Sequence, residues 1–316
     1  MKHDNRLLAN LEHNLGPVIM QSLCDPDVVE IMLNPDGNLW IEKLGQDMQQ
    51  VSSLPPAQVR LIISLVASGL ETVVTTENPI VEGELPLDGS RFEGLLPPVV
   101  SGPSFTIRKK ASRVFSLEDY VAAGILNTEC LVAIHTALVK RKNILVVGGT
   151  GSGKTTLVNA LIHALSDLCP DDRLLILEDT MELQSRSKNA VFFRTSDFVG
   201  MSRLVKVTMR YRPDRIIVGE VRDGAALDLL KAWNTGHPGG IATVHANSAT
   251  EGLDRLEELI AEATPAPKQK LIGKSVGLVI FIERAPGGRR VSEILEVIGH
   301  EAGINQYLTE VLYHVQ

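Results

Sequence analysis

The stretch Gly148–Thr155 reads GGTGSGKT, which has the spacing of a phosphate-binding loop. The apolar run Ile144–Val147 leads into it, and Thr156–Leu165 follows with the pattern of a helix. Glycines let such a loop curl round phosphates with its N–H groups pointing inward, at the positive end of the following helix. Because strand, loop and helix come in this order, a glycine-rich turn that matches by chance is the weaker interpretation.

Two side chains of this loop are expected to act on a nucleotide directly. Lys154 is placed to reach the β- and γ-phosphates, and the hydroxyl of Thr155 is placed for Mg²⁺. The predicted nucleotide-binding residues are Gly148, Gly149, Thr150, Gly151, Ser152, Gly153, Lys154, Thr155 and Thr156. The loop therefore predicts ATP and Mg²⁺ as cofactors.

Carboxylates follow the next apolar run along the chain. Leu174–Leu177 ends in Glu178 and Asp179, and Glu182 comes shortly after. In parallel α/β folds such strand ends open on the ligand crevice. Carboxylates there can orient a water against the γ-phosphate or complete the Mg²⁺ shell. The alternative, an acidic cap of the next helix, is less favoured beside a phosphate-binding loop.

Two further blocks carry polar side chains at predicted strand ends. The run Arg215–Glu220 resembles a Walker B strand, with Glu220 where Asp is commoner, and its acid would sit beside Mg²⁺. The alternative is a buried strand capped by a solvated acid. The block Thr235–Asn247 holds two of the eight histidines. Its second histidine, His245, falls at another predicted strand end and is predicted to touch and sense the γ-phosphate; the alternative is a structural histidine. A metal site is not expected there, because no Cys or second ligand stands at zinc spacing.

Arg91 and Arg108 lie ahead of this region of the chain. An isolated arginine is usually a solvated surface charge. Two arginines from an adjoining domain can instead reach nucleotide phosphates, as arginine fingers do.

The elements that must position these residues divide into two domains. In the first, Val28–Leu33 and Asn38–Glu42 predict a hairpin, and residues 57–69 an amphipathic helix. After residue 140, short apolar runs alternate with helical stretches, which predicts a largely parallel α/β sheet. We expect a domain over 1–100, a linker over 101–116 and a mononucleotide-binding domain over 117–316, with Ser116 capping its first helix.

Composition limits the function further. The net charge of −7 and the 4% of aromatic residues argue against nucleic acid as a direct substrate. No apolar run approaches the roughly 20 residues of a membrane-spanning helix, so a cytoplasmic protein is expected, with peripheral attachment to a membrane complex left open. The three cysteines, Cys24, Cys130 and Cys169, have no metal-ligand spacing, and no zinc is expected.

With these blocks in order, the sequence resembles the hexameric type II and type IV secretion ATPases. The phosphate loop, LEDTMEL, RPDRIIVGEVRD and TGHPGGIATVHA match that superfamily's Walker A, Asp, Walker B and His boxes. The segments DPDVVEIMLNPDGNLWIEK and LPLDGSRFEGLLPPVV are similar to the conjugative-transfer branch of TrbB type. The lack of the tetracysteine zinc module of extension ATPases also favours that branch.

The resemblance implies a RecA-like P-loop ATPase domain preceded by a smaller PAS-like α/β domain, six chains in a ring, and inner-membrane secretion components as partners. It also implies catalytic roles for Lys154 and His245, Glu182 as the catalytic glutamate, Glu220 as the Walker B glutamate and Mg²⁺ partner of Thr155, and Arg91 and Arg108 as nucleotide contacts.

The expected function is ATP hydrolysis that powers a conjugative or type IV secretion apparatus, with a hinge near residues 100–115. Three alternatives stay open at this point: a type IV pilus retraction motor, a nucleotide-gated assembly scaffold whose hydrolysis is incidental, and a DNA-translocating ring.

Overall fold

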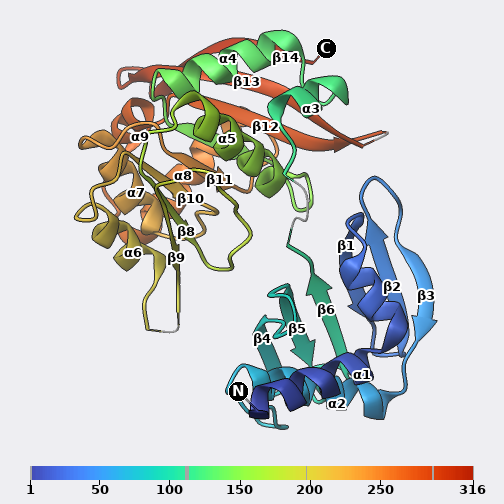
Figure 1. The fold of residues 1–316 in the computed structure, drawn as a ribbon. Coiled ribbons are helices and arrows are strands. Elements are labelled where there is room, and N and C mark those ends of the chain that lie inside the picture. Colours follow the sequence, from blue (N-terminus) through green and yellow to red (C-terminus); the bar gives the residue numbers. More distant parts are fainter. Residues whose placement is uncertain (1, 111–113, 197, 287, 316) are drawn as a thin grey trace. The chain divides into compact units, whose positions relative to one another are not determined.

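The computed structural model describes residues 2–110, 114–196, 198–286 and 288–315 (Figure 1). The chain divides into two compact units, residues 1–113 and 114–316. No helix within the described ranges is both long enough and apolar enough to cross a membrane.

The first unit is a six-stranded antiparallel sheet packed against two helices (Figure 1). The strand order is β3-β2-β1-β6-β5-β4. The elements are α1 (Lys2–Cys24), β1 (Val28–Leu33), β2 (Asn38–Lys43), β3 (Gln49–Ser53), α2 (Pro56–Gly69), β4 (Ile80–Glu84), β5 (Arg91–Leu95) and β6 (Ser104–Arg108). The expected hairpin and amphipathic helix are thus present as β1–β2 and α2.

The linker expected over residues 101–116 is wrong in its first part. Residues 104–108 form β6, which pairs with β1 on one side and β5 on the other. The alternating side chains of Phe105 and Ile107 are buried in the core of the first unit. The prolines and glycines nearby suggested a linker, but strand pairing with residues 28–33 places this segment inside the sheet. The predicted cap is correct, since the Ser116 side chain accepts the Asp119 N–H ahead of helix α3.

The second unit is an eight-stranded sheet with helices on both faces (Figure 1). Its strand order is β14-β13-β12-β7-β11-β10-β8-β9, and β7 to β12 run parallel. The strands are β7 (Ile144–Val147), β8 (Leu174–Glu178), β9 (Ala190–Arg194), β10 (Arg215–Val218), β11 (Ile241–Val244), β12 (Leu278–Ala285), β13 (Gly288–Glu301) and β14 (Gln306–His314). The helices are α3 (Leu117–Ala122), α4 (Thr128–Val139), α5 (Lys154–Leu168), α6 (Met201–Thr208), α7 (Ala225–Asn234), α8 (Ala249–Ala263) and α9 (Gln269–Ser275).

Each central strand is buried on both faces. In β7, Leu145 and Val147 belong to the cluster under α6 to α9, whereas Ile144 and Val146 belong to the cluster under α3 to α5. All residues of β7, β8, β10 and β11 are buried. This explains why apolar runs located these strands in the sequence. The strands that the sequence did not indicate, β9, β13 and β14, are not buried throughout but mix buried or half-buried residues with exposed ones.

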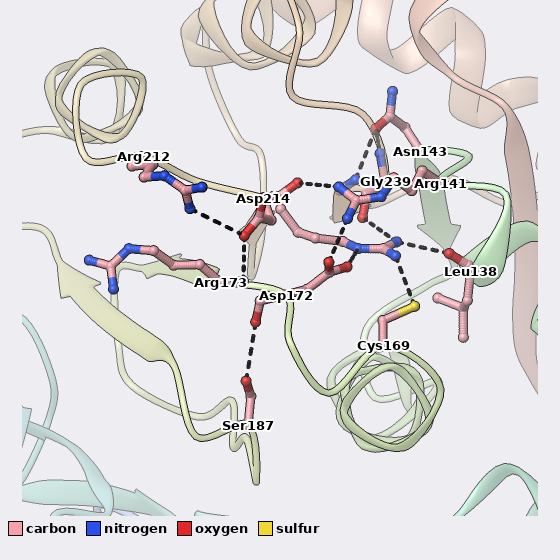
Figure 2. A network of polar contacts seen from close by, with 12 residues as sticks. Leu138, Arg141, Asn143, Cys169, Asp172, Arg173, Ser187, Arg212, Asp214 and Gly239 are labelled. Atoms are coloured by element: carbon pink, nitrogen blue, oxygen red, sulfur yellow. Dashed lines mark hydrogen bonds and ion pairs between the residues drawn. The ribbon is translucent and has the colours of Figure 1, made fainter.

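A polar network joins the amino ends of the parallel strands (Figure 2). The Arg215 side chain, at the start of β10, is 0% exposed, and its Nε donates to the Asp172 carboxylate at 2.6 Å. Its other nitrogens donate to the carbonyls of Leu138 and Gly239 and to the sulfur of Cys169. The guanidinium therefore connects β10 to the segments that precede β8 and β11 and to the end of α4.

The Asn143 side chain connects the amino ends of the neighbouring strands. Its side-chain oxygen accepts the N–H groups of Gly239 and Gly240, at 2.7 and 2.9 Å, and its amide donates to the Ser275 carbonyl at 2.6 Å. These bonds tie the start of β7 to the starts of β11 and β12. Buried polar groups without partners are costly, so the whole network has to form together.

We expect Arg215→Met to lower the free energy of unfolding of the second unit by about 3 kcal/mol or more. The Asp172 carboxylate keeps only its second partner, Arg141, and the buried carbonyls of Leu138 and Gly239 lose a donor. Trp233, whose indole N–H donates to the Ile216 carbonyl, reports this region in denaturant titrations of a Trp40→Phe background. Arg212→Met is the matched control, because the Arg212 side chain is 86% exposed and pairs loosely with Asp214. Equal effects of the two substitutions would contradict the role given to Arg215.

Candidate nucleotide site

The phosphate-binding loop connects β7 to α5 at the carboxyl edge of the parallel sheet. Gly151 and Gly153 have φ values of +67° and +97°, which only glycine adopts readily. Gly153 is the N-cap of α5, so the loop closes on the amino end of a 15-residue helix. The Lys154 side chain is buried at the mouth of the loop, where it donates to the carbonyls of Gly148 and Gly149 at 2.8 and 2.9 Å.

Two further observations fit a phosphate ligand. A side chain at Gly148 would lie 2.3 Å from the Ile282 carbonyl and 2.5 Å from the Ser152 hydroxyl, so the backbone can curl here only as glycine. The Ser152 hydroxyl is buried and has no hydrogen-bond partner among the described residues. A tight glycine loop at the amino end of a helix, with a buried and unpartnered hydroxyl beside it, suits an anion with several oxygens.

A histidine links the lysine of the loop to the carboxylate of Glu220. The Nζ of Lys154 lies 3.2 Å from Nδ1 of His245, and Nε2 of His245 lies 2.8 Å from a carboxylate oxygen of Glu220. An ammonium group can only donate, so Nδ1 must accept and the ring proton must sit on Nε2, from which it is donated to Glu220. His245 thus follows β11, Glu220 follows β10 and Lys154 follows β7, and the sheet order brings them together.

The surroundings of His245 favour its neutral form. Burial is the main cause that lowers its pKa, the positive charge of Lys154 lowers that pKa further, and the carboxylate of Glu220 acts against both. The other oxygen of Glu220 accepts two N–H groups of Arg222, at 2.8 and 2.5 Å. The pKa of Arg222 is raised, first by this hydrogen bond and to a smaller degree by the charges of Asp179 and Glu182.

The three carboxylates that follow β8 have different surroundings. Glu178 is buried, and one of its oxygens accepts the backbone N–H groups of Glu182 and Leu183, both at 3.0 Å. Asp179 accepts the Thr195 hydroxyl at 2.9 Å. The Glu182 carboxylate is half-buried and accepts no hydrogen bond from the residues the structure describes. Glu178 therefore holds the loop that presents Glu182.

Residues that the sequence did not indicate complete this edge. Asn159, on α5 and almost fully buried, accepts the Gln184 N–H at 2.8 Å and reaches the Glu182 carbonyl at 3.4 Å. A lone asparagine within the apolar stretch 157–165 was its only signal. Thr243 donates its hydroxyl to the Gly219 carbonyl at 2.7 Å, which fixes the end of β10 beside β11.

Arg91 and Arg108 lie in the first unit, whereas the other predicted site residues lie in the second. They stand directly opposite each other on β5 and β6. Glu84 is opposite Arg91 on its other side, and Glu30 is opposite Arg108. The two arginines thus form one row with two carboxylates across four strands. Their contact with nucleotide stays a prediction.

A divalent cation would find few protein ligands here. No group of three or more His, Cys, Asp or Glu side chains within the described ranges is arranged to hold a metal ion. Mg²⁺ is usually held by one or two protein oxygens, water and substrate phosphates, and not by a full protein cage. The Thr155 hydroxyl and the Glu220 carboxylate are the two protein ligands that the sequence predicted for such a site, and metal binding stays a prediction.

The comparisons with known proteins agree with this geometry. Residues 12–285 match the family model described as "Type II/IV secretion system protein". The chain is 55% identical over 292 residues to a "Probable conjugal transfer protein TrbB" of Sinorhizobium fredii, covering 92% of this chain and 90% of the relative. It is 53% identical over 305 residues to the "Conjugal transfer protein TrbB" of Rhizobium radiobacter, covering 96% and 94%.

Among solved structures, the fold is similar to that of the ATPase DotB of Legionella pneumophila. The TM-score is 0.63 at 18% sequence identity, over 87% of this chain and 79% of that one. At this identity the likeness concerns the fold alone, and it supports the expected RecA-like architecture of the second unit.

The surroundings of His245 make a prediction for its titration. The ring is expected to be neutral with its proton on Nε2 at pH 7, and its pKa to lie below the usual value of about 6.5. Lys154→Met should raise the pKa of His245, because a nearby cation is lost, and Glu220→Gln should lower that pKa further, because a nearby carboxylate is lost. Ring-nitrogen NMR over a pH series measures both. Shifts in the same direction in the two variants would contradict this arrangement.

Proposed function

The chain belongs to the type II/IV secretion system protein family, and from this premise we propose that it hydrolyses ATP to power a conjugative, type IV secretion apparatus. The two relatives reported above are named for conjugal transfer and match nearly the whole chain, which supports the conjugative branch. Membership of this family supports an ATPase, and ATP hydrolysis by this chain is the part of the proposal that the experiments below test.

One observation carries the proposal more than any other: the lysine of the phosphate loop, His245 and Glu220 form a continuous chain of polar contacts. A nucleotide in the loop would present its γ-phosphate to Lys154 and therefore close to His245. Any change at the γ-phosphate would alter the contacts of His245 and, through it, those of Glu220. This supports a site that distinguishes ATP from its hydrolysis product.

For the reaction itself we assign Glu182 as the group that orients and deprotonates the attacking water. The water oxygen forms a bond to the γ-phosphorus while the bond from that phosphorus to the bridging oxygen breaks, which gives ADP and inorganic phosphate. Glu182 suits this role because it is presented at the strand end without being committed to another contact, unlike Glu178. Lys154 stabilises the charge on the transferred group.

Thr155 and Glu220 are the residues proposed to hold Mg²⁺, which would supply neutralisation of the phosphate charge when bound. The Asn159 side chain fixes the backbone of the Glu182 loop to α5, so the base and the phosphate loop are held by one helix.

Six copies in a ring are proposed as the working assembly, with inner-membrane secretion components as partners. Arg91 and Arg108 would then contact nucleotide from the first unit as arginine fingers. On their sheet the two arginines stand opposite each other, and each has a glutamate opposite it on the next strand.

Two substitutions test the catalytic assignment. Lys154→Ala should abolish ATP turnover, because the phosphates lose their main cation. Glu182→Gln should still bind ATP but hydrolyse it about a hundredfold more slowly or worse, because the general base is lost. Glu178→Gln is the matched control: it keeps the oxygen that receives two backbone N–H groups, so it should lose far less. Phosphate release measures all three, and normal turnover by Glu182→Gln would refute its role as the base.

The same variant separates a motor from a nucleotide-gated scaffold. Cells that carry Glu182→Gln in place of the wild-type chain should fail to transfer a conjugative plasmid if hydrolysis does mechanical work. A scaffold would need only bound ATP, and transfer would then continue near the wild-type frequency.

A further inference from the structure

The hairpin formed by β12 and β13 packs directly against the phosphate-binding loop. Strand β12 is the parallel neighbour of β7, so its carboxyl end comes out beside the loop. The Nε of Arg284 donates to the Gly151 carbonyl at 3.1 Å. The Arg289 side chain lies against Gly153, where an added methyl group would be 2.8 Å from its Cδ. Two arginines about 130 residues away in sequence thus meet the loop at successive glycines.

The strand pairing within this hairpin gives Arg284 and Arg289 a different opposite residue from that of the neighbouring Arg290. Glu283 is opposite Arg290, and the two form an ion pair at 3.0 Å. That pair and a hydrogen bond from Ser292 lower the pKa of Glu283, the hydrogen bond most. The next pair along the ladder is Arg284 opposite Arg289. Like charges directly opposite each other destabilise an antiparallel pair, so this position is unfavourable for the hairpin by itself.

Burial makes the second arginine more unusual. The Nε of Arg289 is buried and has no hydrogen-bond partner among the described residues. The side chain is close enough to the buried Tyr120 of α3 for its charge to act on the pKa of that phenol, which burial raises. The backbone nearby is anchored, because the Val291 N–H donates to the Ile125 carbonyl at 2.9 Å. Arg289 is therefore held in place with donor capacity unused.

The sheet order places these cations on the opposite side of the loop from the proposed catalytic groups. Strand β11, with His245 at its end, flanks β7 on one side, and β12 flanks it on the other. His245, Glu220 and the Glu182 loop all belong to the β11 side, where the γ-phosphate is proposed to lie. The phosphates nearer the nucleoside must then extend from the loop away from that side.

We propose that Arg284 and Arg289 form a phosphate subsite that binds the α- and β-phosphates, the part that ADP and ATP share. Guanidinium groups bind phosphate oxygens through paired, charge-assisted hydrogen bonds, and an anion between the two arginines removes their mutual repulsion. This inference rests on the nucleotide binding proposed above. It adds that the site has two parts: the hairpin binds the diphosphate, and the residues on the β11 side contact the γ-phosphate.

Equilibrium binding of a fluorescent ADP and of a fluorescent, non-hydrolysable ATP analogue tests this division. Arg284→Gln and Arg289→Gln should each weaken both ligands about tenfold, because each removes a charge-assisted contact to phosphates that both ligands carry. Arg290→Gln is the matched control on the same hairpin and should leave both dissociation constants unchanged. His245→Ala should weaken the ATP analogue more than ADP.

Thermal melting gives a second readout that a merely structural role would not produce. Without nucleotide, the melting temperature of Arg284→Gln reports the structural part of its role, because the substitution also removes the hydrogen bond to the Gly151 carbonyl. With saturating ADP this variant should gain less stabilisation than the wild-type chain does, because its affinity is lower.

Unchanged ADP binding in both arginine variants would overturn the subsite, and so would equal weakening by Arg290→Gln. Neither measurement depends on turnover. If the wild-type chain binds nucleotide but does not hydrolyse it, the proposed enzymatic function fails while the subsite remains testable.

Discussion

In a sheet that is buried on both faces, polar side chains can be placed and hydrogen-bonded only at the two ends of the strands. This constraint shapes the second unit. At the amino ends, the fully buried guanidinium of Arg215 and the side chain of Asn143 hold five strands in register through carbonyls, N–H groups and the Asp172 carboxylate. Because this end is fixed, the residues that follow the carboxyl ends of the same strands lie along one edge of the sheet. Glu182, Glu220, Lys154 and His245 depend on that alignment.

The carboxyl edge is then divided by charge. On the β11 side of the phosphate loop, Arg222, Glu220, His245 and Lys154 are joined in that order, so cations, a carboxylate and an imidazole share one network. On the β12 side, two arginines stand opposite each other in the ladder. A mixed-charge network can respond to the loss of a phosphate by exchanging partners, whereas two guanidinium groups favour keeping an anion bound. The proposed site thus has one side suited to respond to the γ-phosphate and one side suited to hold the diphosphate.

Each unit has a pair of arginines that stand opposite each other on described neighbouring strands. Arg91 and Arg108 face each other on β5 and β6, as Arg284 and Arg289 do on β12 and β13. In the first unit, Glu84 and Glu30 continue the row on both sides and offset the repulsion. In the second, the row ends at the arginines, and the adjacent ion pair of Glu283 with Arg290 is already complete. The same pairing therefore has different consequences in the two sheets.

The sequence by itself determined what short-range patterns can specify. The loop Gly148–Thr155 is contiguous, so its glycines and lysine predict both the shape of the loop and a phosphate ligand. The buried parallel strands are uniformly apolar, so their runs located them and fixed the α/β class. The helix start at Ser116 follows from local hydrogen bonding alone.

Tertiary structure decided what depends on pairing between distant segments. Residues 104–108 became β6 because β1 and β5 pair with them, against the local signal of proline and glycine. Glu178 and Glu182 have different surroundings because the loop after β8 folds back so that the N–H groups of Glu182 and Leu183 donate to the Glu178 carboxylate. The approach of Arg284 and Arg289 to the loop follows from β12 lying next to β7, and nothing in the local pattern of either segment encodes that neighbour.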